Sequence, residues 1–132
     1  MLVSIITSKG GPTPQGMVHT DQAWITARFN GQVVVDQDPV LTNFSLDGAS
    51  RTYHDFDLEL AESGNVLEIT NLPDSTGPIR IHALAVSHLI SKPWHTAYID
   101  GVEIKNATPT GWSNIENLKP GSTVVWHLDD LK

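Results

Sequence analysis

The chain has 132 residues, of which 39% are hydrophobic and 17% charged, so it can bury the core of one domain and is not expected to be disordered. Eight basic residues against fifteen acidic ones give a formal net charge of −7, which argues against nucleic acid and anionic membranes as partners. The absence of cysteine excludes disulfides, thiolate metal sites and cysteine nucleophiles.

The first third of the chain is predicted to form short strands separated by turns. A Gly- and Pro-rich segment at 8–16 predicts a flexible arm or loop after the first strand. Asn30-Gly31 favours a type I′ hairpin, because both central residues of that turn need a positive φ. The strands expected here lie near residues 2–7, 17–20, 22–29, 32–37 and 40–46.

From residue 52 onward the hydrophobicity alternates with a period of two, which indicates half-buried strands. The run 79–89 is instead apolar on both faces and predicts a central strand. Strands are expected near residues 52–60, 65–71 and 79–90. In the first of these, one face carries Phe56, Leu58 and Leu60, and the other carries Asp55, Asp57 and Glu59.

The C-terminal part is predicted to add strands near 95–105 and 122–129, with a hairpin turn at Asp100-Gly101. A single helical turn is expected over 113–118, capped by Ser113 and Glu116. The whole chain, 1–132, is therefore predicted to be a single all-β domain. Its class is an antiparallel β-sandwich, jelly-roll-like, with about nine to ten strands.

No enzyme signature is present. The chain lacks the G-x-S-x-G, P-loop, dinucleotide-binding and H-E-x-x-H motifs. Its six histidines are expected at polar positions on half-exposed strands rather than as metal ligands. We therefore predict that the protein is not an enzyme and has no catalytic residues.

The carboxylates are the candidate metal ligands. Asp55, Asp57 and Glu59 share one strand face, and Asp74 lies in a Pro-Asp-Ser-Thr-Gly loop. Calcium takes carboxylate and carbonyl oxygens of this kind, although such a row of acids is more often a solvated strand face. We expect no cofactor, with calcium as the alternative.

The tryptophans are the candidate ligand and interface residues. Trp94 and Trp112 follow proline-containing segments beside loops, where an indole can stack on a sugar, anchor a protein interface or close the end of the sandwich. Trp24 and Trp126 alternate with apolar residues and are expected in the core.

The order of strands and turns from Phe29 to Val86, FNGQVVVD followed by SRTYHDFDLELAESGNVLEITNLPDSTGPIRIHALAV, resembles the small jelly-roll carbohydrate-binding modules of the calcium-dependent xylan-binding type. Such modules have a GQ-V hairpin, an F-x-L strand, an N-x-L-x-I strand, a loop and a long buried strand. The resemblance implies a jelly roll that binds a xylan-type polysaccharide with calcium. Of the carboxylates that these modules place around the long strand, only Asp74 stands near the expected place.

The chain also resembles phage capsid-decoration and tail-adhesin sandwiches, in its size, its lack of a leader before the N-terminal apolar stretch and the segment LKPGSTVVW. This resemblance implies a virion component, made in the host cytoplasm without a signal peptide. Such a protein would decorate or stabilise an assembly, with its own copies or capsid and tail subunits as partners, and we expect a homo-oligomer. The alternative is a carbohydrate-binding module secreted as part of a larger enzyme.

Overall fold

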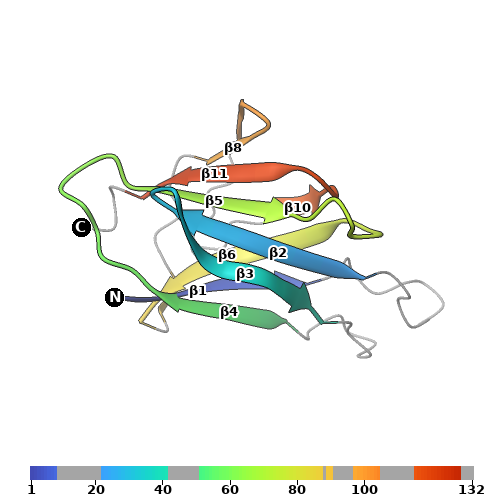
Figure 1. Ribbon diagram of the computed structural model, residues 1–132, viewed down its shortest axis with the longest axis horizontal. Coiled ribbons are helices and arrows are strands. Elements are labelled where there is room, and N and C mark those ends of the chain that lie inside the picture. The colour runs from blue at the N-terminus through green and yellow to red at the C-terminus, as the bar shows by residue number, and fades with distance from the viewer. Residues whose placement is uncertain (9–21, 42–50, 88, 91–96, 105–114, 129–132) are drawn as a thin grey trace.

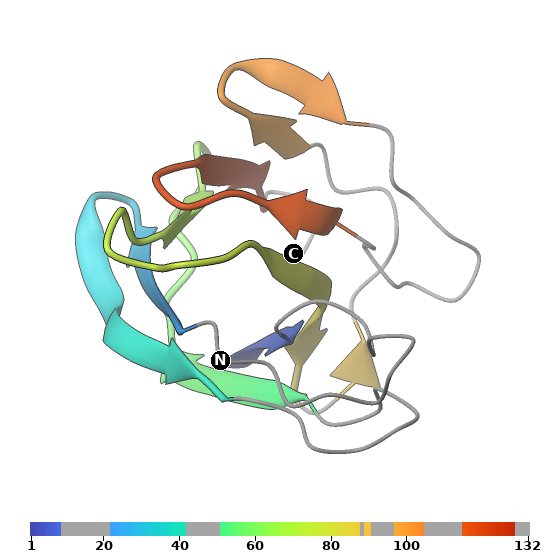
Figure 2. The ribbon, with the colours of Figure 1, turned by 90° about the vertical axis from the view of Figure 1, so that its right-hand side faces the viewer.

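The alternating segments of the chain form strands that lie in two packed antiparallel sheets (Figures 1 and 2). The computed structural model describes residues 1–8, 22–41, 51–87, 89–90, 97–104 and 115–128. Within these ranges there is no helix long and apolar enough to cross a membrane. The predicted all-β antiparallel sandwich is confirmed.

We call the two layers sheet A and sheet B. Sheet A has five strands, in the order β10 (Ile115–Leu118), β6 (Ile79–Val86), β1 (Leu2–Ser8) and β4 (Thr52–Asp57), with β7 (Leu89–Ile90) also paired to β6. Sheet B has six strands, in the order β3 (Gln32–Val40), β2 (Ala23–Phe29), β5 (Val66–Asn71), β11 (Thr123–His127), β8 (Ala97–Ile99) and β9 (Val102–Ile104).

Strands β3 and β4 are edge strands of different sheets and lie beside each other along one side of the sandwich (Figures 1 and 2). A hydrogen bond of 3.0 Å from the Leu41 amide to Thr52 Oγ1 joins the chain after β3 to the start of β4. The two layers are therefore tied at this side as well as through the core.

Both predicted hairpin turns are confirmed. Asn30 and Gly31 have φ values of 49° and 84°, and Asp100 and Gly101 have 49° and 85°, the left-handed pair that a type I′ turn requires. The Asn30 turn is also fixed to the neighbouring strand, because Asn30 Oδ1 accepts a hydrogen bond of 2.8 Å from the Val66 amide. The Asp100 turn forms the tip of the β8–β9 hairpin.

The facing sides of the two sheets form one hydrophobic core, in which Trp126 is 1% exposed, as predicted. Strand β6 is central in sheet A and is buried on both faces. Its Leu84 packs in the main core, whereas Ala83 and Ala85 form a second small cluster with Ile6 on the opposite face of the sheet. The prediction of a central strand from its apolar run is confirmed for 79–86. Its extension to residue 90 is wrong, because Ser87 has a positive φ and 89–90 form β7, which pairs back onto β6.

The prediction of a helical turn over 113–118 is wrong for the residues that the structure describes. Ile115–Leu118 is strand β10, in which Ile115 pairs with Ile81 and Leu118 with Ile79 of β6. Pairing with a central strand and burial of both apolar side chains outweigh the local capping signal. Residues 9–16, the expected strand at 17–20 and residues 42–46 lie outside the described ranges.

Candidate functional site

The side chains that could carry chemistry are positioned by an irregularity in edge strand β3. Val35 pairs with Ala27 and Asp38 pairs with Ile25 of β2, so three steps along β3 match two steps along β2. The extra residue is accommodated at Gln37, which has a left-handed φ of 47° and donates its amide to Thr26 Oγ1 at 3.2 Å. This β-bulge turns Asp38 to the inner face of sheet B, where regular alternation would have placed it outside.

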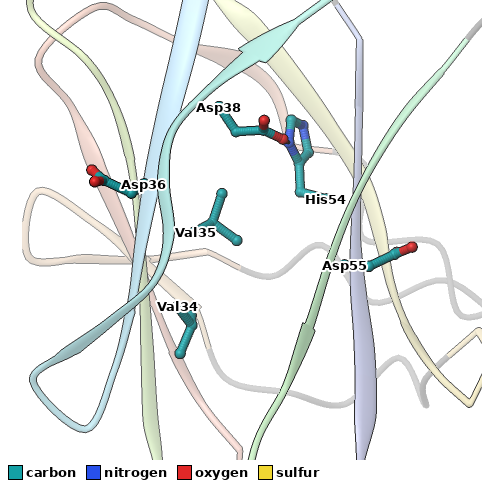
Figure 3. A pocket seen from close by; sticks show the side chains of 6 residues that line it. All are labelled: Val34, Val35, Asp36, Asp38, His54 and Asp55. Atoms are coloured by element: carbon teal, nitrogen blue, oxygen red, sulfur yellow. The ribbon is translucent and has the colours of Figure 1, made fainter.

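On that inner side Asp38 meets His54 of β4 (Figure 3). Asp38 Oδ2 lies 2.6 Å from His54 Nδ1, and the other ring nitrogen, Nε2, lies 2.7 Å from Thr7 Oγ1 of β1. The three residues therefore form a chain of hydrogen bonds that runs from the edge of sheet B into sheet A.

Burial sets the charge of the imidazole. Desolvation lowers the pKa of His54, and the hydrogen bond and charge of Asp38 together with the charge of Asp55 oppose this only in part. In the neutral ring Nδ1–H donates to Asp38, and Nε2 accepts a hydrogen bond from the Thr7 hydroxyl. One tautomer thus satisfies both ring nitrogens.

A hydroxyl, an imidazole and a carboxylate in this order are also the elements of a nucleophilic triad. Here the Thr7 side chain is fully buried and His54 is 1% exposed, so no substrate reaches the hydroxyl. The arrangement joins the two sheets instead. The expectation that the histidines sit at half-exposed positions is wrong for His54, because the inward face of β4 carries it into the core.

A hollow of about 200 Å³ lies at the outer side of this chain, lined by Val34, Val35, Asp36, Asp38, His54 and Asp55. Figure 3 shows that the carboxylates of Asp36 and Asp55 point away from the Asp38–His54 pair. Among the described residues, no group of three or more His, Asp or Glu side chains could hold a metal ion. The hollow therefore does not present a converging ligand set.

The predicted calcium ligands occupy separate places. Asp55 lies on the outer face of β4 and accepts a hydrogen bond from the Ser4 hydroxyl. Asp57 and Glu59 are exposed and line a different hollow of about 330 Å³, together with Asn30 and Gln32. Calcium at these residues stays a prediction.

A second histidine sits on the outer side of sheet A. His82 Nε2 lies 2.8 Å from the Ser8 hydroxyl. Desolvation, together with the smaller effects of the charges of Arg51 and Arg80, lowers the pKa of His82 to about 4. This ring is therefore neutral at pH 7.

Asp74, predicted as a ligand residue, lies beside an unexpected partner. It lines a hollow of about 260 Å³ together with Trp24, Gln37 and Leu72. Trp24 alternates with buried Ala23 and Ile25, which places the indole on the outer face of sheet B, where it is half-buried. The expectation that Trp24 belongs to the core is therefore wrong.

Trp94 and Trp112, the other predicted ligand or interface residues, lie outside the described ranges. Among the described residues, the hollow beside Trp24 is one place where the structure brings an aromatic ring and a predicted site residue together. Comparison of the chain with protein-family models, with curated proteins and with solved structures finds no match.

Proposed function

We propose that the protein is a non-catalytic β-sandwich that decorates or stabilises an assembly, as a capsid-decoration or tail accessory component of a phage virion. One observation carries this proposal. Of the large hydrophobic side chains that are exposed in the described strands, Val33 lies on β3, Tyr53 on β4 and Val102 on β9, and all three strands are sheet edges. Edge strands with exposed apolar side chains are where β proteins associate laterally.

Strand β9 is the edge best suited to such an association. Val102 is 69% exposed, and the β8–β9 hairpin projects from the body of the sandwich (Figure 2). Strand β3 is less suitable, because it contains Pro39 and two shifts of register that obstruct the pairing of a further strand. A partner strand, from a second copy or another virion subunit, would pair with β9.

The buried chain of Thr7, His54 and Asp38 supports the non-catalytic part of the proposal. This hydroxyl–imidazole–carboxylate set joins two sheets, and its hydroxyl is sealed from solvent. Groups that a hydrolase would expose to substrate here contribute to the interior.

Size-exclusion chromatography with multi-angle light scattering tests the assembly proposal. The wild type should run as an oligomer. In Val102→Lys the oligomer should dissociate at higher protein concentrations than in the wild type. The matched control is Glu62→Gln, which changes the charge by the same amount at an exposed position away from the strands. A wild type that stays monomeric at every concentration contradicts self-association through β9.

A second function, carbohydrate binding, is favoured by a different observation. The half-buried indole of Trp24 faces a hollow that also presents a carboxylate and a side-chain amide. Such a combination of flat apolar surface and polar groups is typical of sugar-binding proteins. Co-sedimentation with insoluble xylan, in calcium and in chelator, tests this function independently of oligomeric state.

A further inference from the structure

We propose that the hollow lined by Trp24, Gln37, Leu72 and Asp74, which we call the Trp24 hollow, binds a single neutral sugar ring. The inference rests on the second proposed function, carbohydrate binding, and assigns that function to a site and a ligand size. The volume of the hollow is about 260 Å³. This is below the ~300–1,000 Å³ of pockets for drug-sized ligands and suits one ring rather than a buried chain of rings.

The stacking surface is Trp24. Both of its neighbours in β2, Ala23 and Ile25, are buried in the core, so the indole stands on the opposite face and remains partly exposed. A large aromatic side chain left partly exposed beside a hollow presents flat apolar area of the kind on which the C–H face of a pyranose packs. Leu72 adds apolar surface on the same side.

One wall of the Trp24 hollow, the loop after β5, is joined to β2 by backbone and side-chain hydrogen bonds. The Leu72 amide donates to the Trp24 carbonyl at 2.9 Å, and the Trp24 amide donates to Ser75 Oγ at 3.0 Å. Gln22 and Thr76 exchange two more hydrogen bonds, each of 2.8 Å. Asp74 therefore sits in a loop fixed at both of its ends, which reduces the entropy lost when a ligand binds.

The opposite wall is the bulge of β3. Gln37 has a left-handed φ of 47°, and its amide is tied to Thr26 Oγ1. Non-glycine residues in this conformation are uncommon and concentrate at functional sites. The bulge that turns Asp38 inward thus also places Gln37 at the outer hollow.

The polar groups of the hollow fit hydroxyls better than a cation. The carboxylate of Asp74 accepts hydrogen bonds, and the amide of Gln37 both donates and accepts. Neighbouring hydroxyls on one sugar ring need both kinds of partner, and the carboxylate and the amide together supply them. We therefore assign a neutral pyranose to the site.

Two-dimensional ¹H–¹⁵N NMR of the full chain tests this assignment, because the four tryptophans give four indole N–H signals. The Trp24 signal is identified by its loss in Trp24→Phe. Xylohexaose, cellohexaose and maltohexaose are titrated separately, in calcium and in chelator, with tetramethylammonium as the cation probe. At least one of these oligosaccharides should shift the Trp24 indole signal.

Variants complete the test. Trp24→Ala should weaken binding of the oligosaccharide by at least about tenfold, and Asp74→Asn by a smaller factor. Tyr98→Ala is the matched control, since Tyr98 is also a half-exposed aromatic in sheet B but does not line the hollow. It should leave the affinity unchanged. Circular dichroism of each variant checks that its fold is intact.

The possible results distinguish failure of the Trp24 hollow as the binding site from failure of carbohydrate binding itself. Shifts at another indole, with affinity unchanged in Trp24→Ala, would refute the site and leave carbohydrate binding standing. No response to any of the three oligosaccharides, with or without calcium, overturns both. A response of the Trp24 signal to tetramethylammonium alone overturns the assignment of a neutral sugar.

Discussion

The imidazole of His54 lies 2.6 Å from the carboxylate of Asp38, although the two residues belong to opposite sheets. The contact depends on a bulge in β3, because Asp38 faces inward only where Gln37 takes up the extra step in the register. The imidazole is fully enclosed, whereas the Asp38 side chain is 47% exposed. A buried base is therefore linked to solvent through one half-exposed carboxylate.

Removing Asp38 should destabilise the protein modestly. In Asp38→Ala the Nδ1–H of buried His54 loses its acceptor, and we expect a loss of about 1 kcal/mol in the free energy of unfolding, since a half-exposed pair is weakened by solvent. The measurement is urea denaturation at pH 7. Asp36→Ala is the matched control, because Asp36 lies on the same strand and points away from His54 (Figure 3). Equal losses in the two variants would contradict the role given to Asp38.

Thr7→Val tests the other end of the hydrogen-bond chain. The substitution keeps the side-chain volume but removes the hydroxyl that donates to His54 Nε2 inside the core. The free energy of unfolding should fall by about 1–2 kcal/mol, the cost of a buried acceptor without a partner. Because Thr7 is fully buried, water cannot replace the hydroxyl without a change in packing. A neutral or stabilising effect would show that the hydrogen bond does not support the sheet contact.

Acid should weaken the fold below pH 6.5. The pKa of His82 falls from its ordinary value of 6.5 to about 4 in the folded protein, so the unfolded chain binds a proton in this range while the folded chain does not. The contribution of His82 to stability is therefore fully present above pH 6.5 and is lost as the pH falls toward 4. The pKa of His54 is lowered in the same direction, so both histidines contribute with the same sign.

The variant His82→Gln should flatten this dependence. Thermal unfolding followed at pH 7 and pH 5 should show a smaller fall in melting temperature than in the wild type. Added salt should change the slope little, because desolvation rather than the charges of Arg51 and Arg80 is the main cause of the lowered pKa. An unchanged pH dependence in the variant would contradict the proposed proton linkage.

The left-handed backbone at Gln37 predicts that glycine is tolerated there better than valine, the reverse of the usual order in a strand. Gln37→Gly should be neutral or slightly stabilising, because glycine adopts the left-handed φ of 47° without strain, whereas Gln37→Val should cost about 1–2 kcal/mol. Gln32, on the same strand and without a positive φ, is the control and should prefer valine to glycine. Chemical denaturation of the four variants compares the two orders directly. The same order at both positions would contradict the strain assigned to Gln37.

Asn71 is expected to be the most sensitive polar position. Its fully buried side chain donates to the carbonyls of Gly77 and Leu118, at 3.2 and 2.9 Å, and so joins β5, the loop after it and β10. Asn71→Asp replaces both donors with a buried acid facing two carbonyls and should cost at least about 3 kcal/mol. Hydrogen exchange should show that β10 loses protection first. A cost below that of Asp38→Ala would contradict this role.

The sandwich is predictable because its turns and strands are specified by short local sequence patterns. Asn30-Gly31 and Asp100-Gly101 specify their turns through φ alone, and the alternation around Phe56 follows directly from the pleat of a strand. Strand β10 was not predictable, because four residues gain their structure only by pairing with β6. Its pattern of a capping serine and a glutamate favours a helix when the partner strand is unknown.

The candidate site is not predictable from the sequence either, because it depends on contacts between distant parts of the chain. No short pattern marks Gln37 as the bulged residue, and without the bulge neither the inward turn of Asp38 nor the neighbourhood of Trp24 and Asp74 follows from the sequence. His54 shares its strand face with Phe56, which was a usable sign that the imidazole is buried. The position of Asp74 in a Pro-Asp-Ser-Thr-Gly loop indicates a candidate site residue, but its aromatic neighbour comes from a distant strand.

The bulge of β3 has Gln37 on one face of sheet B and Asp38 on the other, so one backbone irregularity serves both faces. A molecule bound at Gln37 would lie one residue from the carboxylate that accepts a hydrogen bond from His54. If its binding shifted the bulge, occupancy of the Trp24 hollow and protonation of the buried imidazole would be coupled, and such coupling acts equally in both directions. Acidification would alter affinity at the outer surface, and a bound molecule would alter the acidity of a ring that it never touches.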